Sequence, residues 1–154
     1  MSHDVGERLP DFSLPTDGGG TLTTASLSGK KVVLYFYPKD DTSGCTKEAH
    51  AFRDMADAFA AAGATIVGVS KDSVASHDKF KKKHSLPFAL VSDEEGHLCN
   101  ALGVWVQKSM YGKSYMGIER TTFLVDKAGV IRRVWRKVKV PGHAAEVLAA
   151  AQDL

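Results

Sequence analysis

The fold of this chain is decided by the run KVVLYFY at residues 31–37. The run is rich in β-branched and aromatic residues and does not alternate with polar ones, which is typical of a strand buried on both faces of a sheet. Pro38 ends the run, and a short polar loop leads into a segment of helical periodicity that begins at Cys45. We therefore predict a central strand whose carboxyl end delivers the chain into a helix.

A helix is predicted from Cys45 to Ala62, because apolar residues recur there at intervals of three and four. Gly63 follows the last of them, as is common just past the end of a helix. The next run, ATIVGVS at residues 64–70, has the composition of a second buried strand. Since a helix joins these two strands, we expect them to be parallel and connected by a right-handed crossover.

The rest of the chain extends this alternation. We predict a helix over 73–84 with Phe80 facing the core, a strand over 88–92, a short helix over 96–102, a hairpin of 120–126 with 130–136, and a helix over 142–154. Ahead of the central strand, residues 11–14 and 21–23 flank DGGG at 17–20 and predict a further hairpin. The order predicts one α/β domain spanning residues 1–154, a three-layer sandwich with helices on both faces of a mixed sheet.

Composition narrows the class of protein. The 154 residues are 44% hydrophobic and 25% charged, as in ordinary globular proteins, and the net charge of +2 is too small to predict a nucleic-acid or anionic-membrane partner. We expect no membrane span and, from residues 1–8, no secretory signal. The sparse use of cysteine favours a cytoplasmic protein with reduced, reactive thiols. The basic stretch 132–139 is interpreted as an exposed strand edge, with a docking patch as the alternative.

Cys45 is the candidate nucleophile. It lies in the first turn of the predicted helix, at the carboxyl end of the central strand, where binding crevices form in α/β sheets. Free cysteine has a pKa of ~8.5, and helix N-termini with nearby cations lower such values to between roughly 3.5 and 7.5. The alternative is a core cysteine acting as a small hydrophobe. The polar or small neighbours Ser43, Gly44 and Thr46 argue against that alternative.

The segment around Cys45 resembles the active-site motif of the peroxiredoxins, with Pro38, Thr42 and Cys45 at the matching positions. The similarity continues through residues 52–54, 91–93, 103–105 and 120–126, and it indicates the Q-type subgroup, also called bacterioferritin comigratory proteins. The resemblance implies a thioredoxin-like fold with the N-terminal β-hairpin as an extension. It also implies a thiol-dependent peroxidase of antioxidant defence that reduces hydrogen peroxide and organic hydroperoxides without a cofactor or metal.

The chemistry of that reaction explains the residue types. The Cys45 thiolate attacks a peroxide oxygen, which gives a sulfenic acid and releases water or an alcohol. We expect Thr42 to offer its hydroxyl to the peroxide, and the backbone N–H groups of Gly44 and Cys45 to be further donors to the departing oxygen. Gly44 lets a ligand approach the backbone closely. Pro38 is expected to hold the loop and shield the thiolate from water.

Two charged residues are expected near the sulfur. The resemblance implies that Arg120 contacts Cys45 and orients the peroxide. Without the resemblance, Arg120 would be interpreted as a surface cation. Glu48 shares a helix face with Cys45, and we expect it either to pair with an arginine such as Arg120 or Arg53 or to be simply solvated.

The sequence departs from the family at the resolving cysteine. The two positions that carry it in relatives, five and thirty-six residues after Cys45, are His50 and Lys81 here. We interpret Cys99 as a passive, partly buried residue, with a resolving role as the less favoured alternative, because reaching Cys45 would require local unwinding. The hypothesis is a one-cysteine cycle in which thioredoxin or another external thiol reduces the sulfenic acid of a monomeric protein.

Competing interpretations are weaker. A thiol–disulfide oxidoreductase would need Cys-x-x-Cys, but the residue three after Cys45 is Glu48. A non-enzymatic module that borrows the fold is the other alternative. His50 and His143 are isolated in sequence, and His77 and His84 have no third ligand in view. We therefore expect surface or hydrogen-bonded histidines rather than a metal site.

Overall fold

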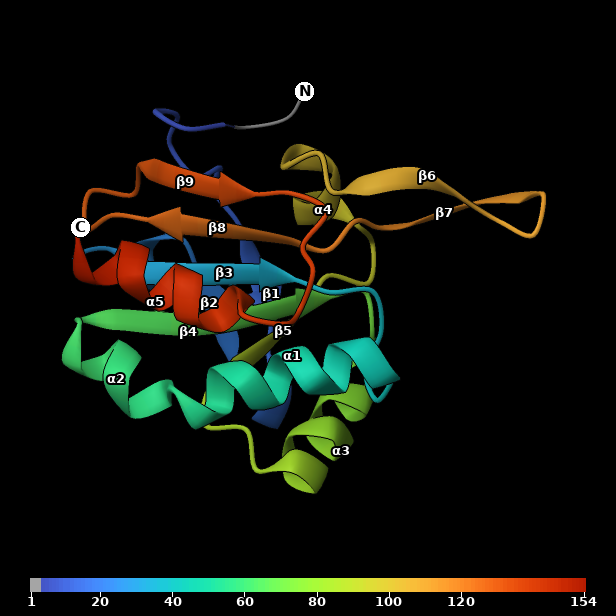
Figure 1. Cartoon of the computed structure of the whole chain (residues 1–154), viewed down its shortest axis with the longest axis horizontal. Coiled ribbons are helices and arrows are strands. Elements are labelled where there is room, and N and C mark those ends of the chain that lie inside the picture. The colour runs from blue at the N-terminus through green and yellow to red at the C-terminus, as the bar shows by residue number, and fades with distance from the viewer. Residues whose placement is uncertain (1–3) are drawn as a thin grey trace.

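The computed structural model describes residues 4–154. Residues 1–3 lie outside it, and they include the start of the predicted domain and of the segment 1–8, for which no secretory signal is predicted. Its centre is a five-stranded sheet in the order β5-β4-β3-β8-β9 (Figure 1). The strands are β3 (Lys31–Phe36), β4 (Ala64–Ser70), β5 (Ala89–Ser92), β8 (Thr121–Val125) and β9 (Ile131–Trp135). Strand β3 pairs parallel with β4 and antiparallel with β8, which confirms the predicted mixed sheet.

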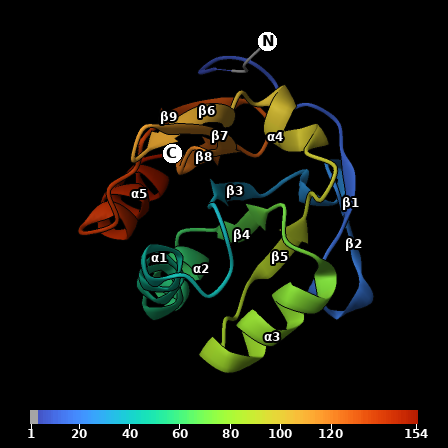
Figure 2. The ribbon, with the colours of Figure 1, turned by 90° about the vertical axis from the view of Figure 1, so that its right-hand side faces the viewer.

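Helices cover both faces of this sheet. Figure 2 shows α1 (Ser43–Asp54), α2 (Ala56–Ala61) and α5 (His143–Gln152) on one side, and α4 (His97–Ala101) on the other. Successive side chains of β3 enter opposite cores, so that Tyr35 packs on the α1 side and Leu34 on the α4 side. Both are fully buried, which confirms a central strand without polar alternation and the three-layer arrangement.

The N-terminal hairpin is also confirmed. Strands β1 (Ser13–Pro15) and β2 (Thr21–Thr23) pair antiparallel around the short helix η1 (Asp17–Gly19), and η2 (Ala25–Leu27) follows. Asp17 ties this hairpin to the sheet, because one carboxylate oxygen accepts from the backbone N–H of Leu90 at 2.8 Å. The other oxygen pairs with Lys81 of α3 (Val74–His84) at 2.7 Å.

The helix predicted over 45–62 is wrong at both its start and its continuity. Helix α1 begins at Ser43, and the helix breaks at Met55 before α2. The Met55 N–H bonds to the carbonyl of Phe52, three residues back, which tightens the turn there. The apolar stripe continues through the break, since Phe59 is as buried as Phe52. Periodicity alone therefore did not reveal it.

The predicted pairing of 120–126 with 130–136 is confirmed as β8 with β9, but a third hairpin was not predicted. Strands β6 (Trp105–Met110) and β7 (Lys113–Ile118) form a two-stranded ribbon that projects from the body of the molecule (Figure 1). Tyr111 and Gly112 make its turn with positive φ angles of 52° and 78°. Four consecutive residues of β7, Lys113 to Met116, are exposed, so the ribbon lacks the one-sided burial that produces an alternating strand pattern.

The first half of the basic stretch 132–139 lies on β9, an edge strand of the sheet, and the second half follows that strand. Arg132 and Arg133 are exposed, which confirms the predicted exposed edge. Within residues 4–154, no helix is both long and apolar enough to cross a membrane.

Candidate active site

Cys45 is the third residue of α1, and Thr42 is the residue that caps the helix. The carbonyl of Thr42 accepts the N–H of Thr46 at 2.8 Å, which is the first hydrogen bond of the helix. The N–H groups of the first turn have no partner within a helix, so those of Gly44 and Cys45 are available to a ligand. The Cys45 side chain is 2% exposed. The earlier start of the helix therefore leaves Cys45 in its first turn, as expected.

Arg120 reaches Cys45 from a distant part of the chain. It directly precedes β8, whose Thr121 lies opposite Phe36 at the end of β3. One guanidinium nitrogen, Nη2, is 3.4 Å from Cys45 Sγ, and Nη1 donates to Glu48 Oε1 at 2.7 Å. Because β3 leads into the loop before α1, the pairing of β8 with β3 places the arginine beside the thiol.

Glu48 pairs with Arg120 and is not solvated. Its carboxylate is buried, and Oε2 has no hydrogen-bond partner among the described residues. Burial raises the pKa of Glu48 to about 7, although the charge and hydrogen bond of Arg120 act in the opposite direction. The other candidate partner, Arg53, instead pairs with Asp54.

Arg120 stays charged in this setting. Burial by itself would lower its pKa, but Glu48 and Cys45 outweigh burial and raise it. A fixed cation therefore lies between a thiol and a carboxyl group that titrates near neutral pH.

Gly44 leaves room for this contact. A Cβ atom at Gly44 would lie 3.1 Å from Nη2 of Arg120. The missing side chain thus makes room for the guanidinium, a reason that the sequence alone did not suggest. The expected approach of a ligand to this backbone stays a prediction.

The Thr42 hydroxyl is oriented differently from the expectation. It donates to the carbonyl of Lys39 at 2.9 Å, so its hydrogen is already engaged. Its lone pairs remain able to accept a hydrogen bond from a peroxide O–H. In this structure Thr42 is therefore suited to accepting from the substrate and not to donating to it.

Pro38 lines a cleft of about 360 Å³ that the projecting β6–β7 hairpin borders. Trp105 and Lys108 contribute to its wall, and Lys71 lies 3.9 Å above the Trp105 ring. Burial lowers the pKa of Lys108, and the nearby charge of Arg120 lowers it further. The cleft therefore combines apolar surface with cations beside the site.

Cys99 lies in a different environment. It belongs to the core on the α4 side of the sheet, whereas Cys45 belongs to the core on the α1 side. It is fully buried and not partly buried as expected, because α4 packs it against the sheet. Burial raises the pKa of the Cys99 thiol, and the carboxylate of Asp93 raises it further.

His50 and His143 are isolated only in sequence, and both are hydrogen-bonded in the structure, as predicted for the histidines. His50 Nε2 lies 2.9 Å from Nδ1 of His84, because the tertiary fold packs α1 beside the end of α3. His143 is buried and bonds to the Thr122 hydroxyl at 2.8 Å. Burial lowers the pKa of His143 to about 4, so it is neutral at neutral pH.

One group of side chains has the composition of a metal site. Asp40, Asp72 and His77 offer ligand atoms that all lie within 4.8 Å of one another. His77 Nδ1 is already 2.7 Å from an Asp40 oxygen, and Asp72 accepts from the Asp40 backbone N–H at 2.8 Å. These groups satisfy one another, and the expectation of a metal-free protein stays a prediction.

Comparison with known proteins adds independent evidence on the family of this chain. The model of the AhpC/TSA family matches residues 5–134. A putative peroxiredoxin bcp of Coxiella burnetii is 57% identical over 148 residues, which cover 96% of this chain and 98% of the relative. Peroxiredoxin Bcp of Bacillus subtilis is 51% identical over 154 residues, covering 100% and 98%.

Solved structures agree. A mutant of Xylella fastidiosa PrxQ superimposes with a TM-score of 0.93 at 41% identity, over 99% of this chain and 98% of the other. A Xanthomonas campestris bacterioferritin comigratory protein, whose structure is described for alkyl peroxide reduction activity, superimposes with a TM-score of 0.91 at 47% identity over 97% and 98%. The similarity therefore spans nearly the full length of each chain.

Proposed function

Because this chain belongs to the AhpC/TSA family, among the peroxiredoxins of the Bcp or Q type, we propose that its Cys45 thiolate is the group that reduces the peroxide. The chain is a thiol-dependent peroxidase with a thioredoxin-like fold. The observation that carries the assignment to Cys45 is the 3.4 Å contact between its sulfur and Arg120. A guanidinium at that distance stabilises negative charge on sulfur and does not titrate near neutral pH.

The geometry supports the following peroxide step. The thiolate attacks one oxygen of the peroxide, the S–O bond forms as the O–O bond breaks, and Cys45 becomes a sulfenic acid. The second oxygen leaves with the electron pair and takes a proton to become water or an alcohol. Arg120 and the N–H groups of Gly44 and Cys45 would stabilise that charge, while the Thr42 lone pairs would accept the peroxide O–H.

Recycling is proposed to use one cysteine of this chain. An external thiol condenses with the sulfenic acid, releasing water and leaving a mixed disulfide, and a second thiol then frees Cys45. Cys99 is a poor substitute because it is buried in the opposite core and its raised pKa keeps it protonated. The thiol reductant of the family fits this step, and we propose thioredoxin or a similar protein acting on a cytoplasmic monomer.

Intact-protein mass tests the assignment. One equivalent of peroxide should add about 16 Da to the parent and to Cys99→Ser, and nothing to Cys45→Ser. Turnover with thioredoxin should survive in Cys99→Ser. A Cys99→Ser protein that forms the oxidised species once and then cannot be recycled would show instead that Cys99 resolves the sulfenic acid.

A further inference from the structure

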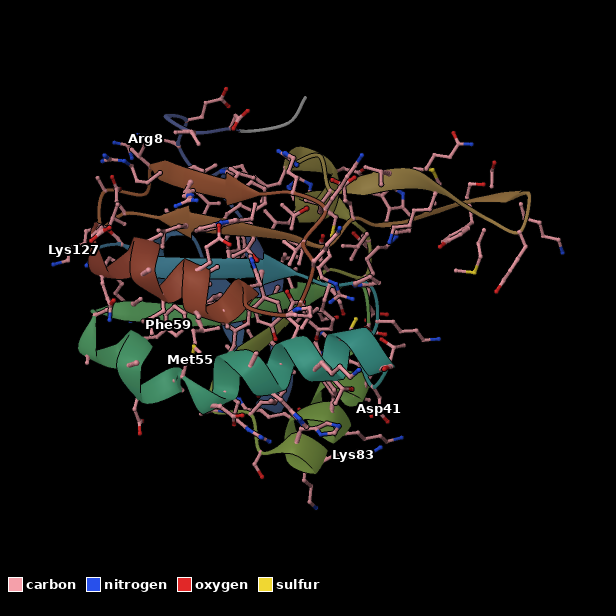
Figure 3. All side chains as sticks on the ribbon, viewed as in Figure 1. Arg8, Asp41, Met55, Phe59, Lys83 and Lys127 are labelled. Carbon is pink, nitrogen blue, oxygen red and sulfur yellow. The ribbon has the colours of Figure 1, made fainter. Side chains whose placement is uncertain are left out.

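The loop between β3 and α1 is attached to α3 by two consecutive aspartates. Asp40 points inward and is buried, whereas Asp41 is exposed. Figure 3 shows Asp41 and Lys83 next to each other at the end of the molecule where α1 begins. The loop leads directly into Thr42 and the helix turn of Cys45, so whatever holds it also positions the reacting sulfur.

Asp40 is saturated with hydrogen bonds. One oxygen accepts from the Tyr37 hydroxyl at 2.5 Å, and the other accepts from Ser76 at 2.8 Å and lies 2.7 Å from Nδ1 of His77. Its backbone N–H donates to Asp72 at 2.8 Å. Ser76 and His77 belong to α3, so the Asp40 carboxylate joins the loop to that helix, while the Asp40 backbone is tied to Asp72 in the segment before α3.

The contacts of the His77 ring suit its protonated form. Its two ring nitrogens face a carboxylate oxygen of Asp40 and, at 2.9 Å, the carbonyl of Val91. The Val91 carbonyl only accepts, and an ionised Asp40 also only accepts, so this geometry suits an imidazolium with a hydrogen on each nitrogen. Burial by itself would lower the pKa of His77, but the bonds to Asp40 and Val91 outweigh it and the pKa is raised. Asp40 and His77 therefore form a fully buried ion pair.

Asp41 holds the same loop from outside. Its φ angle of 60° is left-handed, a conformation that a residue with a side chain keeps only where its surroundings enforce it. The carboxylate pairs with Lys83 at 2.9 Å and His84 at 3.3 Å, both at the end of α3. His84 in turn bonds to His50 of α1. Helix α3 therefore holds the loop through both aspartates, Asp40 and Asp41.

The two steps of the proposed cycle make opposite demands on this loop. Attack on the peroxide needs Thr42, Arg120 and the first turn of α1 in their closed positions. Reduction by a protein thiol needs access to the sulfur of Cys45, a residue that is only 2% exposed in this structure. The loop must therefore open after each turnover, and the bonds that close it oppose reduction.

We propose that Asp40 and His77 are positioning residues whose buried ion pair clamps the loop to α3, favouring the peroxide step at the expense of the reduction step. The proposal rests on the proposed role of Cys45. It predicts effects of opposite sign on the two half-reactions, which a general loss of stability would not produce.

The test measures both half-reactions by rapid mixing, peroxide with the reduced enzyme and thioredoxin with the pre-oxidised enzyme. Asp40→Asn and His77→Gln should slow the peroxide step about 10- to 100-fold and accelerate reduction several-fold. The matched control is Lys81→Met, which removes an ion pair of the same helix, with Asp17, that does not touch the loop. Both rates should stay within about twofold in the control.

Hydrogen exchange separates a local effect from unfolding. Peptides covering residues 38–48 should exchange faster in Asp40→Asn, while those of α5 keep the protection of the parent. If that variant does not fold, Ser76→Ala removes a single bond to Asp40 and should give the same signs with smaller size. The proposal would be wrong if the variants left the rates of both half-reactions unchanged, or if both rates fell together. A parent whose Cys45 gains no oxygen would instead overturn the proposed function.

Discussion

Cys45 and Cys99 occupy equivalent places in two helices on opposite faces of the sheet. Each is the third residue of its helix, α1 or α4, and each is buried. They differ in the charge that meets the helix start. Arg120 lies against the Cys45 sulfur, whereas Asp93 occupies the start of α4 and accepts from the N–H of Cys99 at 2.8 Å.

The two helix starts carry opposite neighbouring charges, so helix position alone does not decide which thiol is favoured as a thiolate. At α4 a carboxylate already uses the positive end of the helix dipole, and it opposes a second negative charge on sulfur. At α1 a guanidinium adds to the dipole, so that a negative charge on sulfur is favoured. Neighbouring charge, and not helix position, distinguishes the two cysteines.

The largest expected effect tests the contrast directly. Cys45→Ser should lose hydroperoxide consumption by at least ~10³-fold, because a serine hydroxyl is not ionised near neutral pH. Cys99→Ser should stay within about threefold of the parent, because serine replaces a thiol that is predicted to take no part. A coupled thiol-oxidation assay compares the three proteins, and equal losses in both variants would remove the distinction.

Replacing Arg120 by a neutral residue should remove most of the expected reactivity of Cys45 toward peroxide. Arg120→Met is expected to slow the reaction with peroxide by about 10²- to 10³-fold, the usual loss of one preorganised donor to a developing charge. It also leaves the Glu48 carboxylate buried and unpaired, which destabilises the fold.

The double variant Arg120→Met/Glu48→Gln separates these two effects. It should regain thermal stability without regaining the peroxide rate. A rate that returned together with stability would show that Arg120 acts only on the fold.

Glu48, which lies near Cys45, should make the stability of the protein depend on pH. Its pKa is raised from 4.5 to about 7, so between these values the folded protein binds more protons than the unfolded chain. The free energy of unfolding should therefore decrease as pH rises from 4.5 through 7, by on the order of 1–3 kcal/mol relative to Glu48→Gln. Urea unfolding of both proteins at several pH values measures the difference, and parallel pH profiles would contradict it.

The smallest effect is expected at Cys99. In a Cys45→Ser background, Asp93→Asn should increase the rate of Cys99 alkylation several-fold at pH 8, since the carboxylate charge no longer opposes the thiolate. Burial remains, so the rate should stay far below that of the unfolded protein. As a control, both proteins should be alkylated equally fast in denaturant. If Asp93→Asn left the rate in the folded protein unchanged, the low reactivity expected of Cys99 would be due to burial alone.

Local sequence predicted the framework well and the contacts poorly. The buried run ending at Phe36 and the turn residues before Cys45 act over a few neighbours, so periodicity and turn chemistry predicted the central strand and the candidate nucleophile. Arg120 was identified only through family resemblance, because its contact with Cys45 spans 75 residues. The ion pair of Asp40 with His77 went unpredicted, because no local pattern relates two residues that meet only after folding.

By itself, the amino-acid sequence determined the strands and helices of the central sheet region, apart from the break at Met55, and that a cysteine begins a helix beyond the central strand, since both follow from short-range propensity and hydrophobic periodicity. Only the tertiary structure decided the charge beside each cysteine. Antiparallel pairing of β8 with β3 carries Arg120 to Cys45, and the turn after β5 places Asp93 at the start of α4. Electrostatic fields act through space, so they depend on which distant residues the packed fold brings together.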